Sequence, residues 1–278
     1  SKGCSEPPPR VILIAMETTL IFAKNLAKQA GECLLDYFQP LGIQAAVKQD
    51  HTALTEADMA ADALISAAIR ERNPHDGLVT EAAGAAYPAG KKYVWVVDPL
   101  DGTTNFSLGL HYWGVSIARL ADGVPDLAAL YFPIIDEMMT AQRGQGAFLN
   151  GQPLQVKPPD ADQPFSFFAC CSRTHRRYHV GIRYKTRILG SAAYGLSTVA
   201  RGSALLGFET VPKVWDFAGS WLLVQEAGGV LQSLQGDDLF PLQADVDYEK
   251  RGLPVLAAAT PELAEYGREN LIPKSREL

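Results

Sequence analysis

The feature that most constrains this chain is an apolar run that ends in two acidic side chains. Residues 93–97 read Tyr-Val-Trp-Val-Val, a run typical of a strand buried on both faces. Asp98 and Asp101 follow directly, and Gly102 then frees the backbone ahead of three polar side chains. Paired carboxylates offer the hard oxygen ligands that magnesium and manganese prefer. A helix that begins at residues 102–103 would also turn free N–H groups toward the site and hold a phosphate there.

The same string has an ordinary interpretation, in which Asp101 sits in a turn and caps the helix that follows. An isolated Asp-x-x-Asp-Gly pattern is more often such a turn, because these residue types favour turns in any context. The whole string placed after a buried strand is much more specific, and it favours a functional site.

Elements of both kinds are interspersed along the 278 residues without a regular strand-helix alternation, which favours α+β layers over a doubly wound sheet. Apolar periodicity predicts helices at residues 11–38, 55–72, 192–201, 214–227 and 261–270. Strands are predicted at residues 77–80, 93–97, 113–120, 127–132, 165–171 and 255–259, with a hairpin turn at Asp122-Gly123. We divide the chain into a flexible lead (1–10), an N-terminal α+β half (11–157) and a C-terminal α/β half (158–278).

Composition disfavours several classes of function. Lys and Arg total 25 against 31 Asp and Glu, so the net charge of −6 argues against a nucleic-acid partner. No apolar stretch approaches the roughly 20 residues of a membrane span, and residues 1–10 do not resemble a secretory signal. The four cysteines, at positions 4, 33, 170 and 171, form no CxxC pair, so we expect reduced thiols and a cytoplasmic protein.

Four ordered blocks resemble the inositol monophosphatase family of magnesium-dependent, often lithium-sensitive phosphatases. The blocks lie at residues 55–58, 95–106, 188–193 and 214–219, and the last is followed by Glu-Ala-Gly-Gly at 226–229. The resemblance implies a layered αβαβα sandwich of the inositol monophosphatase and sugar phosphatase type, whose halves meet at the active site. It also implies a homodimer and a metal-activated water as the attacking group.

The resemblance assigns a metal set to this chain. Asp98 would bridge two ions, and Glu81 and the main-chain carbonyl of Leu100 would complete the first site. Asp101 and Asp216 would complete the second site. We expect two or three Mg²⁺ ions in each active site, with Mn²⁺ as a substitute.

The resemblance also assigns catalytic and substrate contacts. Thr103, oriented by Asp58, would position or deprotonate the attacking water together with Glu81. The expected substrate contacts are Asp101, Gly102, Thr103, Thr104, Gly190, Ser191, Ala192, Glu209 and Asp216.

Each assignment has a simpler structural rival. Asp58 fits a capping box with Thr55 at the start of the second helix, and Asp216 would complement a helix dipole. Ser191 is typical of a helix N-cap, and Glu209 alone would be a solvated surface charge.

Two features depart from the family or extend it. Ala82 follows Glu81 where a second consecutive glutamate is usual, so we expect Ala82→Glu to raise metal affinity or turnover. Residues 173–187 are the one basic concentration, which predicts either a solvated face or a counter-charge for a second anionic group. In the second case Arg176 and Arg177 would bind that group.

The predicted function is therefore hydrolysis of a small soluble phosphate ester, with inositol monophosphate as the default substrate. Fructose 1,6-bisphosphate or another bisphosphate or nucleotide is the alternative within the same family. A binding module that holds metal and phosphate without turnover is the non-enzymatic alternative. A haloacid-dehalogenase phosphatase is set aside, because Leu100 stands where its nucleophilic aspartate would be. We expect no nucleic-acid or membrane partner.

Overall fold

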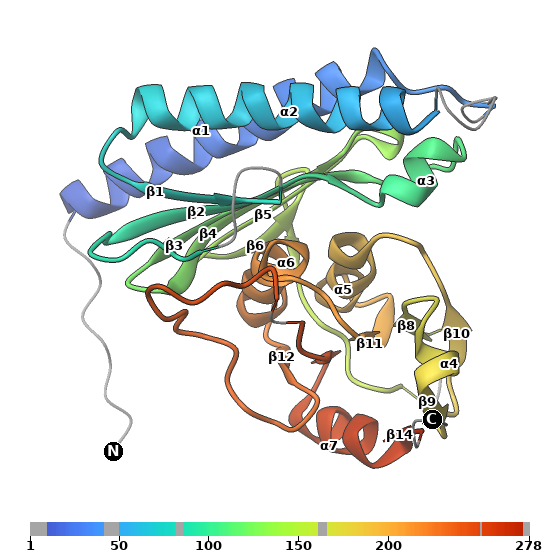
Figure 1. Ribbon diagram of the computed structural model, residues 1–278. Helices are drawn as coiled ribbons and strands as arrows, with labels where there is room; N and C mark the ends of the chain where they lie inside the picture. Colours follow the sequence, from blue (N-terminus) through green and yellow to red (C-terminus); the bar gives the residue numbers. More distant parts are fainter. Residues whose placement is uncertain (1–9, 42–49, 82–85, 161–165, 251, 275–278) are drawn as a thin grey trace.

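The structure, a computed structural model, describes residues 10–41, 50–81, 86–160, 166–250 and 252–274. Its helices and sheets alternate in layers (Figure 1). α1 (Arg10–Leu35) and α2 (Asp50–Arg72) lie together on one face of a seven-stranded sheet. α6 (Val214–Glu226) packs on the other face and against α5 (Ala192–Ala200), which rests on a five-stranded sheet. α7 (Pro261–Asn270) packs on that second sheet, so the predicted αβαβα sandwich is confirmed.

The first sheet has its seven strands side by side in chain order. β1 and β2 are parallel, and every later pair is antiparallel. The predicted turn between β3 and β4 is confirmed, because Asp122 and Gly123 have φ angles of 51° and 80°. The strands are β1 (Gly77–Thr80), β2 (Tyr93–Asp101), β3 (Gly114–Ala121), β4 (Val124–Phe132), β5 (Glu137–Gln142), β6 (Gly146–Leu149) and β7 (Gln152–Leu154).

The second sheet mixes parallel and antiparallel pairs. β8 lies between β10 and β11 and runs parallel to both, whereas β13 runs antiparallel to β11 and β12. In spatial order the strands are β10 (Lys185–Arg187), β8 (Phe167–Cys170), β11 (Ala204–Glu209), β13 (Val255–Ala258) and β12 (Val230–Ser233). The short elements are α3 (Thr103–Ser107), η1 (Pro133–Ile135), α4 (Thr174–Arg177), and β9 (Tyr178–Val180) paired with β14 (Leu271–Pro273).

The core explains why residues 93–97 of β2 are apolar without interruption. Val94 and Val96 belong to the core between the first sheet, α5, α6 and the second sheet. Trp95 and Val97 belong to the separate core beneath α1 and α2. Both faces of this strand are therefore buried, as the run of apolar residues predicts.

The predicted boundaries of the first two helices are wrong. α2 begins at Asp50 instead of Thr55, since residues 50–54 contain no glycine or proline that would stop the helix from extending. α1 ends at Leu35 instead of residue 38, with Asp36 and Tyr37 in a turn. Among the described residues, no helix combines the length and the apolar character that crossing a bilayer requires.

Candidate active site

A bulge in β2 brings the two signature carboxylates to one face of the first sheet. In a regular strand, residues three apart would point to opposite faces. The pairing of β2 with β3 shifts register between Asp98 and Asp101, and Leu100 packs in the core under α1 and α2. Asp98 and Asp101 consequently both reach the α5 and α6 side, where they are only 3% and 5% exposed. The prediction that the strand ends before Asp98 is wrong, because β2 continues through Asp101.

Asp101 is held by the start of α5 instead of capping the helix that follows it. The Ser191 hydroxyl donates to Asp101 Oδ2, and the amide of Ala192 donates to Asp101 Oδ1 at 3.1 Å. Ser191 also accepts the amide of Tyr194 at 3.0 Å, so it is the N-cap of α5 as the simpler reading predicts. Burial raises the pKa of Asp101 to about 6 despite these hydrogen bonds, which lower it.

Asp98 and Asp216 add negative charge to the same region. Asp216 lies in the first turn of α6 and accepts the amide of Lys213 at 2.7 Å, which confirms the helix-start reading. Burial raises its pKa to about 8, and the charge of Asp101 adds to this shift. Burial also raises the pKa of Asp98 well above its usual range, with contributions from Asp101 and Asp216. The carboxylates therefore act on one another electrostatically.

Glu81 and Asp58 approach this group from the α2 side. Glu81 directly follows β1, and part of its side chain is exposed to solvent. Desolvation of its carboxyl group and the charges of Asp58 and Asp101 nevertheless raise its pKa to about 7. Asp58 lies on α2, which contacts α3, and its Oδ1 is buried without a hydrogen-bond partner among the described residues. The capping-box reading of Asp58 is wrong, because Thr55 lies inside α2. Burial and the charge of Asp62 raise the pKa of Asp58 to about 6.

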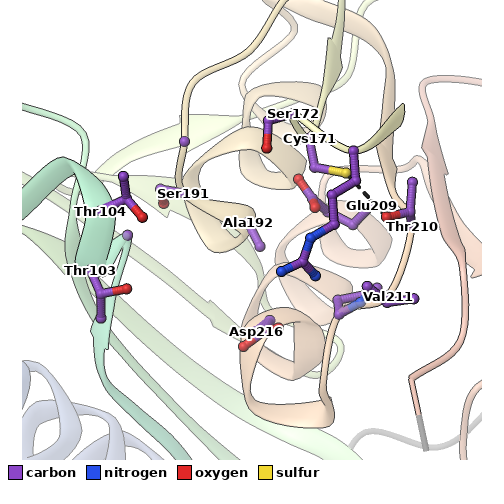
Figure 2. A pocket seen from close by; sticks show the side chains of 14 residues that line it. Thr103, Thr104, Cys171, Ser172, Ser191, Ala192, Glu209, Thr210, Val211 and Asp216 are labelled. Carbon is purple, nitrogen blue, oxygen red and sulfur yellow. Dashed lines mark hydrogen bonds between the residues drawn. The ribbon is translucent and has the colours of Figure 1, made fainter. Parts of the chain in front are cut away.

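A pocket of about 280 Å³ opens beside these carboxylates (Figure 2). Thr103 and Thr104 stand on one side of it, Cys171, Thr210 and Val211 stand opposite, and Ser191, Ala192 and Asp216 lie between. Of the predicted substrate contacts, eight line this pocket: Gly102, Thr103, Thr104, Gly190, Ser191, Ala192, Glu209 and Asp216. The ninth, Asp101, is buried behind the pocket wall, where it holds Ser191 and Ala192.

Asn105 fixes the loop that supplies part of this wall. Its Nδ2 donates to the carbonyl of Leu189 at 2.7 Å and to that of Tyr112 at 2.6 Å. Gly190 has a φ of 79°, and a Cβ at this position would lie 2.4 Å from Asn105 Oδ1. The glycine therefore allows the loop to approach α3 closely. Asn105 and Gly190 both lie in the blocks that resemble the family, but the sequence does not show that the two residues are in contact.

Several wall residues carry no site prediction from the sequence. Ser172, Thr210, Val211 and Pro212 lie in loops that follow β8 and β11, where no motif marks them. The Cys171 sulfur lies 3.3 Å from the hydroxyls of Thr174 and Thr210. These hydrogen bonds lower the pKa of Cys171 against the opposing effect of its burial. Arg173 also lines the pocket, and its only signal is membership of the basic segment.

The donor chemistry of this region fits a divalent cation. Asp98, Asp101, Asp216 and Glu81 present only oxygen atoms, and none of them takes part in an ion pair within the described portion of the chain. The carboxylate of Asp101 accepts a hydrogen bond from Ser191, and that of Asp216 accepts one from the Lys213 amide. Within the described ranges, no group of three Asp, Glu, His or Cys side chains is arranged to hold a metal ion. Metal binding would therefore compete with these two hydrogen bonds. Ala82 lies outside the described residues.

Comparison with known proteins agrees with this arrangement. The profile of the inositol monophosphatase family matches residues 15–271. The Nus factor SuhB of Escherichia coli (strain K12) is 34% identical over 242 residues, which cover 83% of this chain and 91% of that protein. A histidinol-phosphatase of Chlorobaculum parvum is 34% identical over 233 residues, covering 80% and 88%. The structure of inositol monophosphatase from Anabaena superposes with a TM-score of 0.72 at 26% identity, covering 92% and 96%.

The fold, the acidic pocket and these matches define a phosphoric monoester hydrolase that acts on small phosphate esters. More narrowly, the chain belongs to the inositol monophosphatase family, whose members are generally metal-dependent.

Proposed function

We propose that this protein hydrolyses a small phosphomonoester with the help of Mg²⁺, and that inositol monophosphate is its reference substrate. The observation that carries the proposal is the pocket of about 280 Å³ that joins the α3 end of β2 to the starts of α5 and α6. A cavity of that size suits a phosphorylated small polyol better than a macromolecular ester.

The carboxylates are the proposed metal ligands. Asp98, Asp101, Asp216, Glu81 and the carbonyl of Leu100 would hold two or three Mg²⁺ ions, with Mn²⁺ as a substitute. Bound divalent cations lower the pKa of coordinated water and neutralise phosphate charge. The raised pKa values of Asp98, Asp101 and Asp216 support this role, since uncompensated buried carboxylates gain most from a cation.

Proton handling is proposed for Glu81, Asp58 and Thr103. In the metal-free protein the pKa of Glu81 is raised to about 7 and that of Asp58 to about 6, so both carboxylates lie close to neutral pH before a cation binds. Asp58 Oδ1 has no hydrogen-bond partner among the described residues, and α2 contacts α3 where Thr103 begins. Asp58 would accept a hydrogen bond from the Thr103 hydroxyl and so orient the Thr103 oxygen toward the attacking water.

The remaining pocket residues would bind the substrate. The amides of Gly102 and Thr103 would hold phosphate oxygens, and Thr104, Gly190, Ser191 and Ala192 would form the adjoining wall. Glu209 would accept a hydrogen bond from a substrate hydroxyl. Its position in the pocket wall, opposite Thr103 and Thr104, supports this assignment over a solvated surface charge (Figure 2).

The test is a panel of phosphate esters assayed for phosphate release during a Mg²⁺ titration. The panel includes inositol 1-phosphate, histidinol phosphate, fructose 1,6-bisphosphate and 2′-AMP, with Li⁺ added as the expected inhibitor. Asp101→Asn serves as the inactive control. Release that does not depend on Mg²⁺, or that survives in Asp101→Asn, would refute the proposed chemistry. Metal and phosphate binding without any release would instead support the binding-module alternative.

We also propose a homodimer and a cytoplasmic location. A second pocket of about 560 Å³ is lined in part by Leu110, Tyr112 and Ile188, which are 49%, 37% and 51% exposed, and this apolar surface supports contact with a second copy. Leu110→Glu should shift the mass measured by light scattering from dimer to monomer, and a wild-type monomer would refute the dimer. The three described cysteines, Cys33, Cys170 and Cys171, are free thiols, which supports the location.

A further inference from the structure

The basic segment at residues 173–187 contributes a single side chain to the active-site pocket. Arg173 lines the pocket, whereas Arg176 and Arg177 lie on the exposed surface of α4 and are absent from its wall. Arg183 packs over the rings of Tyr184 and Tyr266, and Arg187 donates to the carbonyl of Thr186. Of the two alternatives for the basic segment, the solvated face therefore holds for Arg176 and Arg177, because both are exposed and neither lines the pocket.

The backbone of Arg173 is well anchored although its side chain is exposed. Its amide donates to the Cys171 sulfur, which the hydroxyls of Thr174 and Thr210 also contact at 3.3 Å. Its carbonyl accepts the amide of Arg177 at 3.0 Å. The guanidinium takes part in no ion pair within the part of the chain that the structure describes. The backbone of Arg173 is thus fixed at the pocket wall, and its guanidinium is available to pair with an anion.

Arg173 is the one basic side chain among the fourteen residues of the described pocket wall, which also contains Glu209 and Asp216. Arg173 follows Cys171 by two positions in the sequence, and Cys171 stands across the pocket from Thr103 and Thr104 (Figure 2). An ester whose phosphate lies at the Gly102–Thr104 side would extend toward Arg173. A second negative charge on that ester would be attracted by the guanidinium of Arg173, and this attraction sets the direction in which the molecule binds.

We propose that Arg173 makes this pocket selective for phosphate esters that carry a second anionic group, a phosphate or a carboxylate, at the end remote from the scissile bond. The proposal rests on the proposed function and names its substrate class. A guanidinium presents a planar fork of donors that matches the two oxygens of either group. Lys or a neutral side chain would not reproduce that geometry.

The experiment uses three linear six-carbon esters that differ only at the end remote from one phosphate. These are glucitol 6-phosphate, glucitol 1,6-bisphosphate and 6-phosphogluconate, whose remote groups are a hydroxyl, a phosphate and a carboxylate. Values of kcat and KM are measured for the wild-type chain of 278 residues, for Arg173→Gln and for the matched control Arg176→Gln. Competitive inhibition by phosphonate analogues of the same esters, with CH₂ in place of the ester oxygen, measures binding without turnover.

The expected result is a wild-type preference for the doubly anionic esters that Arg173→Gln lowers by about 10- to 100-fold, chiefly through KM and the inhibition constants. Arg176→Gln keeps the wild-type preference. A loss confined to the bisphosphate or to the carboxylate identifies which group Arg173 binds. Wild type that releases phosphate equally from all three esters, or an Arg173→Gln variant that lowers all three equally, overturns this inference alone. Wild type that hydrolyses none of them overturns it together with the proposed function.

Discussion

Replacement of Gly190 by alanine should be one of the most damaging single-methyl additions near the pocket. The left-handed conformation costs a residue with a Cβ about 1–2 kcal/mol relative to glycine. The new Cβ would also lie 2.4 Å from Asn105 Oδ1, so the Asn105 amide has to move. That movement breaks its hydrogen bonds to Leu189 and Tyr112, worth about 0.5–1.5 kcal/mol each. We therefore expect Gly190→Ala to lower the free energy of unfolding by about 2–5 kcal/mol.

Two other glycines separate the contributions. Gly144 has a φ of 73° and open space around the added Cβ, so Gly144→Ala tests the conformational cost alone. Gly195 lies within α5 with a negative φ and nothing within 4 Å of its Cβ, so Gly195→Ala should be neutral or slightly stabilising. Urea denaturation monitored by circular dichroism gives the free energy of unfolding of each variant.

The free energy of unfolding should fall more in Gly190→Ala than in Gly144→Ala, and more in Gly144→Ala than in Gly195→Ala. Asn105→Ala removes the obstructing amide, so adding Gly190→Ala to that variant should cost only the conformational term. Equal unfolding free energies for Gly190→Ala and Gly144→Ala would refute the close contact with Asn105. Additive effects of Asn105→Ala and Gly190→Ala would refute it independently.

Three further predictions concern the site and the sheet that supports it. Ser191→Ala removes both the N-cap of α5 and a hydrogen-bond donor to Asp101. It should therefore lower the free energy of unfolding by about 1 kcal/mol and raise the pKa of Asp101. An unchanged midpoint of urea denaturation would contradict this prediction. The pKa values of Asp216 and Glu81 are raised to about 8 and about 7, so the metal-free folded state holds protons that the unfolded state has released. Stability without metal should therefore fall as the pH rises from about 4 to 8, and Mg²⁺ should reduce this fall; a flat profile in EDTA would count against it. Arg119 and Asp126 form a buried ion pair at 2.7 Å, and the Arg119 guanidinium lies over the ring of Tyr93. Asp126→Ala should therefore lower the free energy of unfolding by about 3–5 kcal/mol and leave the Mg²⁺ dependence of the folded enzyme unchanged. A loss below about 1 kcal/mol would show that the pair is dispensable.

Much of the site could be predicted because its chemistry is concentrated in short local blocks. The string around Asp98 and Asp101 follows a strand whose apolar run reports burial on both faces, and both properties are local. The wrong prediction for the start of α2 also comes from considering a short segment by itself. Thr55 looks like a cap only when residues 50–54 are left out of the helix, and nothing in residues 55–58 decides that question.

Other features depend on contacts between segments far apart in the chain. Asp101 and Ser191 are ninety residues apart, and only the packing of α5 beside the first sheet brings them together. The bulge in β2 depends on its pairing with β3, and it decides that both carboxylates face α5 and α6. The basic segment shows the same limit, because α4 turns Arg176 and Arg177 outward while Arg173 stays in the pocket wall.

The sequence by itself therefore determined the layered class, the family and the carboxylates, because hydrophobic periodicity and short motifs report burial and local chemistry directly. Tertiary structure alone decided which hydroxyl and amide hold Asp101, why position 190 admits no side chain, and which cation of residues 173–187 lines the pocket. Each of these features depends on the distance between segments that are remote in the chain, and the packing of the layers sets that distance.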